Sequence, residues 1–245
     1  MKNIIEFKNV DLGYVKNENI LENINLNIPE SKMVAVVGKS GIGKTTFFKS
    51  ILDRKKIIAG DVKIFDKDLC KITKKDFKKI INKIGFLTQE SYLIEFDNVF
   101  NNLKRMNNKY KNWFYRFFSI LTKEQKNDLL KILDELNILD KTFTLVSELS
   151  TGEKQRVEIA RVLFQKAELI LADEPTSNLD YHNANNVLEI LKNINLTYQS
   201  SIIVITHDLD LLQKYFDYVV LIENKHVSLI DAKEVDVCKI KQMFK

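Results

Sequence analysis

The segment from Gly38 to Thr45 reads Gly-Lys-Ser-Gly-Ile-Gly-Lys-Thr and matches the phosphate-loop pattern G-x-x-x-x-G-K-[ST]. Glycines let the backbone N–H groups of such a loop wrap around phosphates, and the helix that follows adds the positive end of its dipole. Lys44 is expected to reach the β- and γ-phosphates of a nucleoside triphosphate, and Thr45 to ligate Mg²⁺. The loop residues expected to bind the nucleotide are Gly38, Lys39, Ser40, Gly41, Ile42, Gly43, Lys44, Thr45 and Thr46.

Two adjacent carboxylates, Asp173 and Glu174, follow the apolar run 169–172. Asp173 is placed to hold Mg²⁺ beside Thr45, directly or through water, and Glu174 is a candidate base or water-orienting group for attack on the γ-phosphate. A strand that ends in a polar turn before Pro175 gives the same local pattern. The phosphate loop elsewhere in the chain favours the catalytic interpretation.

A second anion-binding element is indicated by Leu149-Ser150-Thr151-Gly152-Glu153, which opens a predicted helix. A serine hydroxyl, small residues and a helix N-terminus together suit an anion. Ser150 with Glu153 three positions later is equally the pattern of an ordinary capping box. The two interpretations are compatible, and the residues alone do not decide between them.

The elements that must position these side chains are short apolar strands that alternate with helical patterns. Three apolar runs end directly before polar residues, which is typical of buried parallel strands whose carboxyl ends carry a ligand site. The N-terminal stretch alternates with period two and predicts antiparallel strands. The sequence therefore predicts an α/β fold. Strands are expected at 4–10, 24–28, 33–37, 62–65, 84–87, 169–172, 202–205, 218–222 and 227–230, and helices at 45–52, 123–139, 153–164 and 184–194.

Composition limits the function classes. The 245 residues are 45% hydrophobic and 29% charged, which suits one large domain over 1–245, with a mostly helical subdomain at about 90–150. No apolar run approaches the roughly 18 residues that a membrane span needs. The polar breaks in the first ten residues lead us to expect no secretory signal. Two cysteines without C-x-x-C spacing exclude a disulfide framework or zinc site. The net charge of +5 comes mainly from lysine, and we expect no nucleic-acid partner.

The whole set of motifs resembles the ATP-binding subunit of an ABC transporter. The phosphate loop corresponds to Walker A, the segment 149–153 resembles the signature LSGGQ, and 169–174 matches Walker B with its catalytic glutamate. The resemblance adds four positions, each with a plainer alternative in packing or surface polarity. They are Tyr14 stacking on adenine, Gln89 of the Q-loop as a catalytic and Mg²⁺-binding group, Asp180 of the D-loop 177–180 as a nucleotide-binding residue, and His207 as the catalytic switch histidine.

This resemblance implies a phosphate-loop NTPase of the ABC ATPase type, with a mixed sheet, an N-terminal antiparallel β region and a helical subdomain. It also implies a head-to-tail dimer, either a homodimer or a pair with another ATPase subunit, in which each ATP lies between Walker A of one subunit and the signature of the other. Two residues depart from the family pattern, because Thr151 replaces a glycine and Glu153 replaces a glutamine. We expect activity to be retained.

A helical-region segment containing Trp113-Phe114-Tyr115-Arg116-Phe117-Phe118 and the following 122–126 resembles the ATPases of phosphonate-type importers and of mollicute transport systems. The aromatic residues either pack inside the helical subdomain or contact membrane subunits or lipid headgroups. The resemblance implies permease partners, a solute-binding lipoprotein, and a peripheral place on the cytoplasmic membrane face, with a phosphonate-like or other phosphorylated solute as cargo. A separate-subunit exporter and a soluble iron–sulfur assembly ATPase remain the alternatives.

Overall fold

The structure is a computed structural model that describes residues 2–14, 18–88, 92–105, 120–177 and 180–244. The chain divides into two compact units, of which the first comprises Met1–Ile84 with Glu168–Lys245 and the second comprises Gly85–Ala167. The strands and helices of the first unit are β1 (Asn3–Gly13), β2 (Asn19–Pro29), β3 (Met33–Val37), α1 (Lys44–Leu52), β4 (Ile57–Ile64), β5 (Lys67–Asp68), α2 (Lys74–Ile81), β7 (Leu169–Asp173), α7 (Tyr181–Tyr198), β8 (Ser201–Ile205), α8 (Leu212–Tyr215), β9 (Tyr218–Glu223), β10 (His226–Asp231) and α9 (Val237–Phe244).

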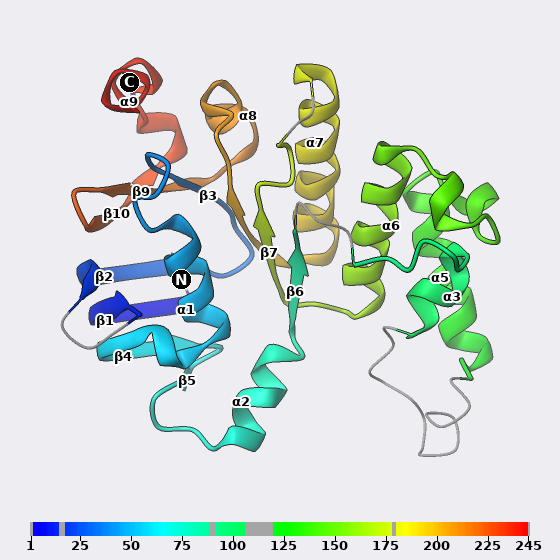
Figure 1. The fold of residues 1–245 in the computed structure, drawn as a ribbon, viewed down its shortest axis with the longest axis horizontal. Coiled ribbons are helices and arrows are strands. Elements are labelled where there is room, and N and C mark those ends of the chain that lie inside the picture. The colour runs from blue at the N-terminus through cyan, green and yellow to red at the C-terminus, as the bar shows by residue number, and fades with distance from the viewer. Residues whose placement is uncertain (1, 15–17, 89–91, 106–119, 178–179, 245) are drawn as a thin grey trace. The chain divides into compact units, whose positions relative to one another are not determined.

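The first unit begins with an antiparallel sheet in the order β2-β1-β4-β5 (Figure 1). Its strands alternate as the sequence predicts: in β2 the apolar Ile24, Leu26 and Ile28 are buried, whereas the asparagines between them are exposed. The buried face packs against α1, where the rings of Phe7 and Phe47 stack with centroids 5.1 Å apart. This packing fixes the helix that follows the phosphate loop.

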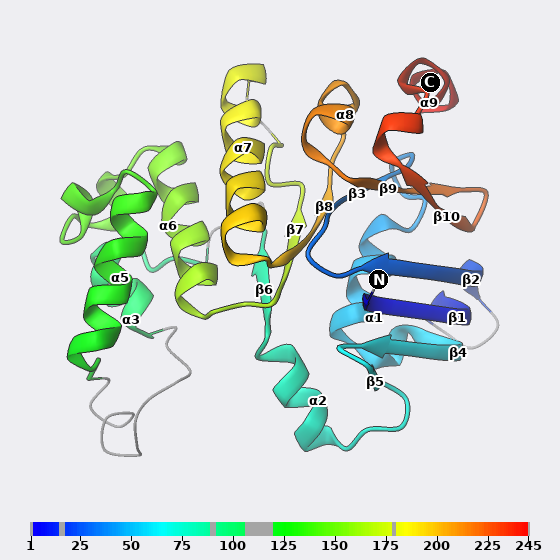
Figure 2. The same cartoon turned by 180° about the vertical axis from the view of Figure 1, so that it is seen from behind.

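The other sheet of the first unit runs in the order β10-β9-β3-β8-β7, as can be followed from both sides in Figures 1 and 2. Strand β3 pairs in parallel with β8 and β9, and β7 pairs in parallel with β8. All five residues of β3 and all five of β8 are buried, which explains their continuous apolar sequences. A hairpin joins β9 to β10 at Asn224 and Lys225, whose φ angles of 48° and 66° suit its right-handed strand twist.

The second unit is mainly helical. Strand β6 (Ile84–Leu87) runs into it from the end of the first unit, and its helices are α3 (Val99–Arg105), α5 (Lys123–Glu135) and α6 (Thr151–Phe164). A Cβ built on Gly85 would lie against the side chain of Val162, so glycine permits β6 to approach α6 closely. The Arg161 guanidinium reinforces this contact by donating to the Phe86 carbonyl at 2.5 Å.

The predicted α/β fold is confirmed, but some element ends are wrong. Helix α5 ends at Glu135 instead of 139, because Asn137 takes a left-handed conformation with φ 53°. Strand β4 was predicted at 62–65, after Gly60, but it begins at Ile57 and includes this glycine. Gly60 has a φ of 82° and lies against the backbone of Asn9, at an irregularity in the β1–β4 pairing that the strand accommodates. Helix α7 extends beyond 184–194 at both ends.

Candidate nucleotide-binding site

The register of the parallel sheet places three loops of the first unit at one edge. Val36 of β3 and Asp173 of β7 both pair with Ile205 of β8. The backbone continues this alignment past the strand ends, since the Glu174 N–H donates to the Ile205 carbonyl at 3.1 Å and the Thr206 N–H donates to the Val36 carbonyl at 3.3 Å. The phosphate loop, the carboxylates and the His207 loop therefore leave the sheet side by side.

The phosphate loop ends at Gly43, which precedes the first residue of α1 with φ 116°. A non-glycine residue is strained in this conformation, and a Cβ there would lie 2.9 Å from Ile20. Within the part of the chain that the structure describes, α1 has no side-chain cap, so the N–H groups of its first turn remain available to an anion. Thr45 is exposed in this turn, while Thr46 is buried.

Lys44 is buried although it carries a charge. Its Nζ donates to the loop's own carbonyls, at 2.8 Å to Gly38 and 3.1 Å to Lys39. Burial lowers the pKa of Lys44, and the charges of Glu174 and Asp173 oppose this shift. The lysine is thus held inside the loop, near both predicted carboxylates.

Asp173 ends β7 in a half-buried position. Burial raises the pKa of this carboxyl, and the neighbouring charge of Glu174 raises it further, whereas Lys49 and Lys44 lower it. A carboxylate that is costly to charge, beside a second carboxylate, is typical of a site built for a cation.

Glu174 lies next to His207. The Nε2 atom of His207 is 2.9 Å from Oε1 of Glu174, so the two predicted catalytic side chains form a hydrogen-bonded pair. The Glu174 backbone has φ 50°, a left-handed conformation that costs free energy for a residue with a side chain. The Glu174 carbonyl also accepts hydrogen bonds from the N–H and hydroxyl of Ser177, at 3.1 and 2.8 Å, which hold this turn in place.

Sequence reasoning missed one link between these loops. The buried Thr176 hydroxyl donates to Oδ2 of Asp208 at 2.5 Å, and the Asp208 N–H donates to the Thr206 hydroxyl at 3.0 Å. Asp208 thereby ties the loop after Glu174 to the loop that carries His207. An aspartate directly after a candidate histidine was the signal available in the sequence.

Tyr14 is 55% exposed, which excludes the alternative of core packing. Its hydroxyl accepts a hydrogen bond from Thr46 of α1 at 3.4 Å, and the Lys56 ammonium lies 3.8 Å from its ring centroid. The structure thus attaches this aromatic side chain to the helix that follows the phosphate loop.

The remaining predicted positions of this part of the site are Asp180 and Gln89. Asp180 caps α7: its Oδ1 accepts from the Asn183 N–H at 2.9 Å, and hydrogen bonds from Asn183 lower the pKa of its carboxyl. Gln89 lies outside the described residues, as do the D-loop residues 178–179 and the aromatic segment 113–118.

In the second unit, Ser150, Thr151 and Gly152 are exposed at the start of α6. Ser150 and Glu153 form the complete capping box, in which each side chain bonds the other residue's backbone N–H. These hydrogen bonds, with the charge of Lys141, lower the pKa of the Glu153 carboxyl. The capping interpretation is therefore confirmed, and Thr151 and Gly152 stay exposed beside the capped serine.

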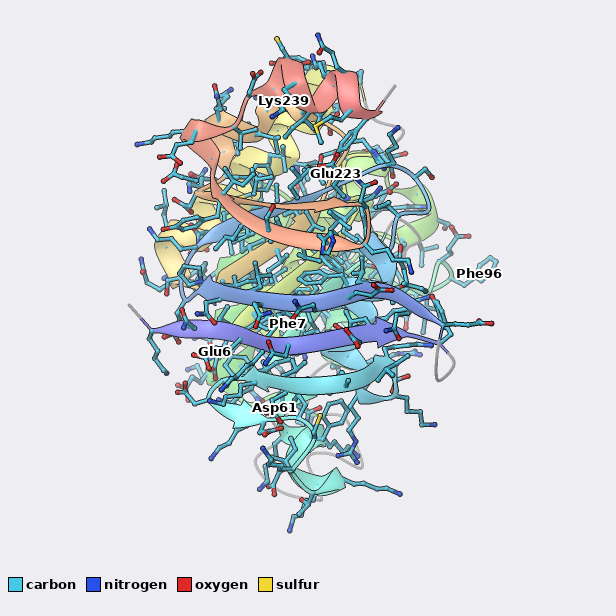
Figure 3. All side chains as sticks on the ribbon, turned by 90° about the vertical axis from the view of Figure 1, so that its left-hand side faces the viewer. Glu6, Phe7, Asp61, Phe96, Glu223 and Lys239 are labelled. Carbon is cyan, nitrogen blue, oxygen red and sulfur yellow. The ribbon has the colours of Figure 1, made fainter. Side chains whose placement is uncertain are left out.

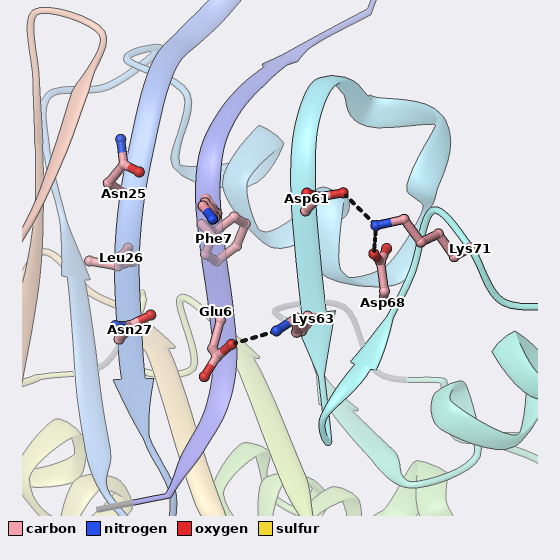
Figure 4. A pocket seen from close by; sticks show the side chains of 10 residues that line it. Glu6, Phe7, Asn25, Leu26, Asn27, Asp61, Lys63, Asp68 and Lys71 are labelled. Atoms are coloured by element: carbon pink, nitrogen blue, oxygen red, sulfur yellow. Dashed lines mark hydrogen bonds and ion pairs between the residues drawn. The ribbon is translucent and has the colours of Figure 1, made fainter.

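A further hollow of about 410 Å³ lies on the solvent face of the antiparallel sheet, and neither its place nor its residues were predicted (Figures 3 and 4). Its charges compensate each other: Lys63 lies 3.4 Å from Glu6, and Lys71 lies 3.3 Å from Asp61 and 2.7 Å from Asp68. This mutual pairing is typical of a solvated sheet face.

Two kinds of feature are absent from the described residues. No helix among them has the length and apolar character that crossing a bilayer requires. No group of three or more His, Cys, Asp or Glu side chains in the same residues could hold a metal ion by itself.

Fold and site together define a phosphate-loop ATPase, and comparison with known proteins places it more closely. Residues 21–177 match the ABC transporter family. The chain is 36% identical over 242 residues to a probable ABC transporter ATP-binding protein p29 of Mesomycoplasma hyorhinis, covering 98% of this chain and 94% of that protein. It is 33% identical over 247 residues to the phosphonates import ATP-binding protein PhnC of Mesoplasma florum, with coverage of 98% and 99%.

Among solved structures, the fold is similar to the dimeric ATP-binding cassette MJ0796 in a post-hydrolysis state with ADP and Pi. The TM-score is 0.73 at 27% sequence identity, over 94% of this chain and 100% of that one. The chain therefore belongs to the ABC transporter family, as an ATP-binding protein with the ATPase activity general to that family.

Proposed function

We propose that this chain is the ATP-hydrolysing subunit of a membrane importer, working as a head-to-tail homodimer. The observation that carries the proposal is the convergence of Lys44, Asp173, Glu174 and His207 at one edge of a parallel sheet. Lys44 binds the β- and γ-phosphates, and Glu174 orients or deprotonates the attacking water while His207 holds its carboxylate. Tyr14 stacks on the adenine, on the ring face not covered by Lys56.

The Mg²⁺ ion that accompanies ATP in such sites stabilises the charge that develops on the phosphates. The residues present fit it, because an exposed Thr45 hydroxyl and the Asp173 carboxylate supply the hard oxygen ligands that Mg²⁺ prefers. The raised pKa of Asp173 supports this role, because a bound cation would stabilise the charged form of a carboxylate that burial disfavours. We also assign Gln89 to this metal, as the link to the permease.

The signature at Ser150 to Glu153 contributes to the site of a second copy. The exposed start of α6 offers hydroxyl and N–H donors to a γ-phosphate. In the proposed dimer, this phosphate belongs to an ATP bound by the phosphate loop of the other copy. We assign Asp180 to the same dimer interface. The similar MJ0796 cassette is dimeric with ADP and Pi, which supports this arrangement. The whole of 1–245 then acts as one nucleotide-binding domain, with about 90–150 as its helical subdomain.

A permease partner is supported by an exposed apolar surface in the second unit. The segments 94–100 and 142–147 are joined by backbone hydrogen bonds, among them Val146 N–H to Asp97 carbonyl at 3.0 Å. Phe96 is 90% exposed and projects from the ribbon in Figure 3, and Phe143 is 75% exposed. The Phe143 ring meets that of Phe100 with centroids 5.9 Å apart and stays largely exposed. Exposed aromatic side chains of this kind mark a protein-binding surface. We place the chain on the cytoplasmic membrane face through this contact.

Relatives named for phosphonate import support import over export or iron–sulfur assembly, and they favour a phosphonate cargo. We extend the proposal to other phosphorylated solutes and to a solute-binding lipoprotein that delivers them. Copurification with a permease and uptake of labelled phosphonate by the assembled system test this assignment. Association with a soluble assembly complex in place of a permease would contradict it.

Lys44→Ala tests the ATPase assignment itself. The variant is expected to lose ATP binding and hydrolysis, because no other buried cation among the described residues of the loop reaches the phosphates. Lys8→Ala removes the same charge from an exposed position on β1 and serves as control. Near-normal hydrolysis by Lys44→Ala would sink the assignment.

A further inference from the structure

The carboxylate of Glu153 already occupies part of the anion site that the signature offers. Its Oε2 accepts the Ser150 N–H and the Ser150 hydroxyl, each at 2.8 Å. The one hydroxyl proton of Ser150 therefore points to Glu153 and away from an incoming ligand. In addition, the negative charge of Glu153 partly neutralises the positive N-terminal end of the α6 dipole, which would otherwise attract a phosphate.

A cation compensates this carboxylate from another element of the same unit. Lys141 ends the short 3₁₀ helix Leu139–Lys141, and its Nζ lies 3.6 Å from Oε1 of Glu153. The same Nζ lies 3.6 Å from Oδ2 of Asp140, whose side chain is 72% exposed and therefore more strongly screened by solvent. Oε1 is the oxygen that Ser150 does not use. Lys141 and Ser150 thus hold opposite sides of one carboxylate, and the side chain of Lys141 is 36% exposed while that of Glu153 is 30% exposed.

We propose that Lys141 is a positioning residue, which neutralises Glu153 and so allows the signature to accept the γ-phosphate of an ATP bound by a second copy. This inference rests on the head-to-tail dimer of the proposed function. When the phosphate arrives, the Ser150 hydroxyl turns from Oε2 to a phosphate oxygen, and Lys141 retains Glu153. Without Lys141, the two anions face each other uncompensated.

The inference is tested by a double-mutant cycle in the Glu174→Gln background, where ATP is bound but not hydrolysed. The readout is the ATP concentration that gives half-maximal dimer in sedimentation analysis. Lys141→Met is expected to raise this concentration about two- to fivefold, the range for an exposed charge at a helix N-terminus. Glu153→Gln is expected to lower it by a similar factor. Lys141→Met added to Glu153→Gln is expected to have no effect.

Lys131→Met provides the matched control, because it removes a lysine of the same unit whose partner is Glu135 within α5. The Lys141 effect should also fade at high salt, where exposed charges are screened. An equal loss from Lys141→Met with Glu153 present or replaced overturns the inference, since a misfolded variant is not rescued by Glu153→Gln. No ATP-driven dimer in the Glu174→Gln protein itself overturns the proposed function instead.

Discussion

At the scale of single residues, the site contains ionisable groups, Lys44 and Asp173, whose charged forms are disfavoured by burial in the nucleotide-free protein. Asp173 is the clearest case, because burial and the charge of Glu174 raise the pKa of its carboxyl above the ordinary value of an aspartate. An acid with a raised pKa in the folded state favours folding when protonated, so stability falls as pH rises from the ordinary pKa through the raised one. At neutral pH the ionised Asp173 therefore destabilises the nucleotide-free protein.

Asp173→Asn is accordingly expected to raise the melting temperature of the nucleotide-free protein at pH 7, by about 2–4 °C per kcal/mol of relieved cost. The gain should shrink as pH falls toward the ordinary carboxyl range, where the wild-type side chain becomes protonated as well. Thermal unfolding at several pH values measures this. Asp134→Asn changes an exposed carboxylate of α5 and is the control. A lower melting temperature for Asp173→Asn at pH 7 would contradict the expected sign.

Glu174 and His207 form the other residue-scale pair. Glu174→Gln is expected to reduce ATP hydrolysis by about 10²–10⁴-fold while ATP binding is retained, since it removes a base but no phosphate contact. His207→Ala should reduce hydrolysis too, because Glu174 loses its partner at 2.9 Å. Steady-state hydrolysis and equilibrium nucleotide binding separate these effects. His226→Ala changes an exposed histidine of β10 and should leave both unchanged.

At the scale of elements, two helices of the second unit begin with the same device. Thr122 with Gln125 caps α5, and Ser150 with Glu153 caps α6. Thr122→Ala and Ser150→Ala are each expected to cost about 1 kcal/mol of stability, measured by urea unfolding. Only Ser150→Ala should also weaken ATP-driven dimer formation. Equal dimerisation by the two variants would show that Ser150 is a cap and nothing more.

Periodicity and motifs predict most of these elements because burial follows the backbone repeat, as in the alternating β2 and the fully apolar β3. The end of α5 was not predictable from apolar spacing, since the left-handed Asn137 interrupts an otherwise continued pattern. The motif residues were found because they are adjacent in sequence. Two contacts were not predictable in this way: Lys141 with Glu153, twelve positions apart, and Thr176 with Asp208. Both arise from tertiary packing, which motif spacing does not encode.

At the scale of the whole molecule, the proposed dimer has each copy contribute to two ATP sites, with the phosphate loop in one compact unit and the signature in the other. We therefore expect ATP to double the sedimenting mass of the Glu174→Gln protein. The wild-type protein should form this dimer only transiently, because hydrolysis releases it. Sedimentation with ATP, with ADP and without nucleotide measures this. A dimer of equal strength in all three conditions would exclude ATP as the driving ligand.

Gly152 is a position at which stability of the folded chain and formation of the proposed dimer are expected to favour different residues. A Cβ built on it meets no described atom within 4 Å, and alanine favours a helix over glycine by up to about 1 kcal/mol. A methyl side chain at this position is therefore expected not to lower the free energy of unfolding. Gly152→Ala is accordingly expected to fold with unchanged or higher thermal stability. In the proposed dimer, such a substitution would act only where two copies meet over ATP, so a library sorted by folding alone would enrich changes that block ATP-driven dimer formation.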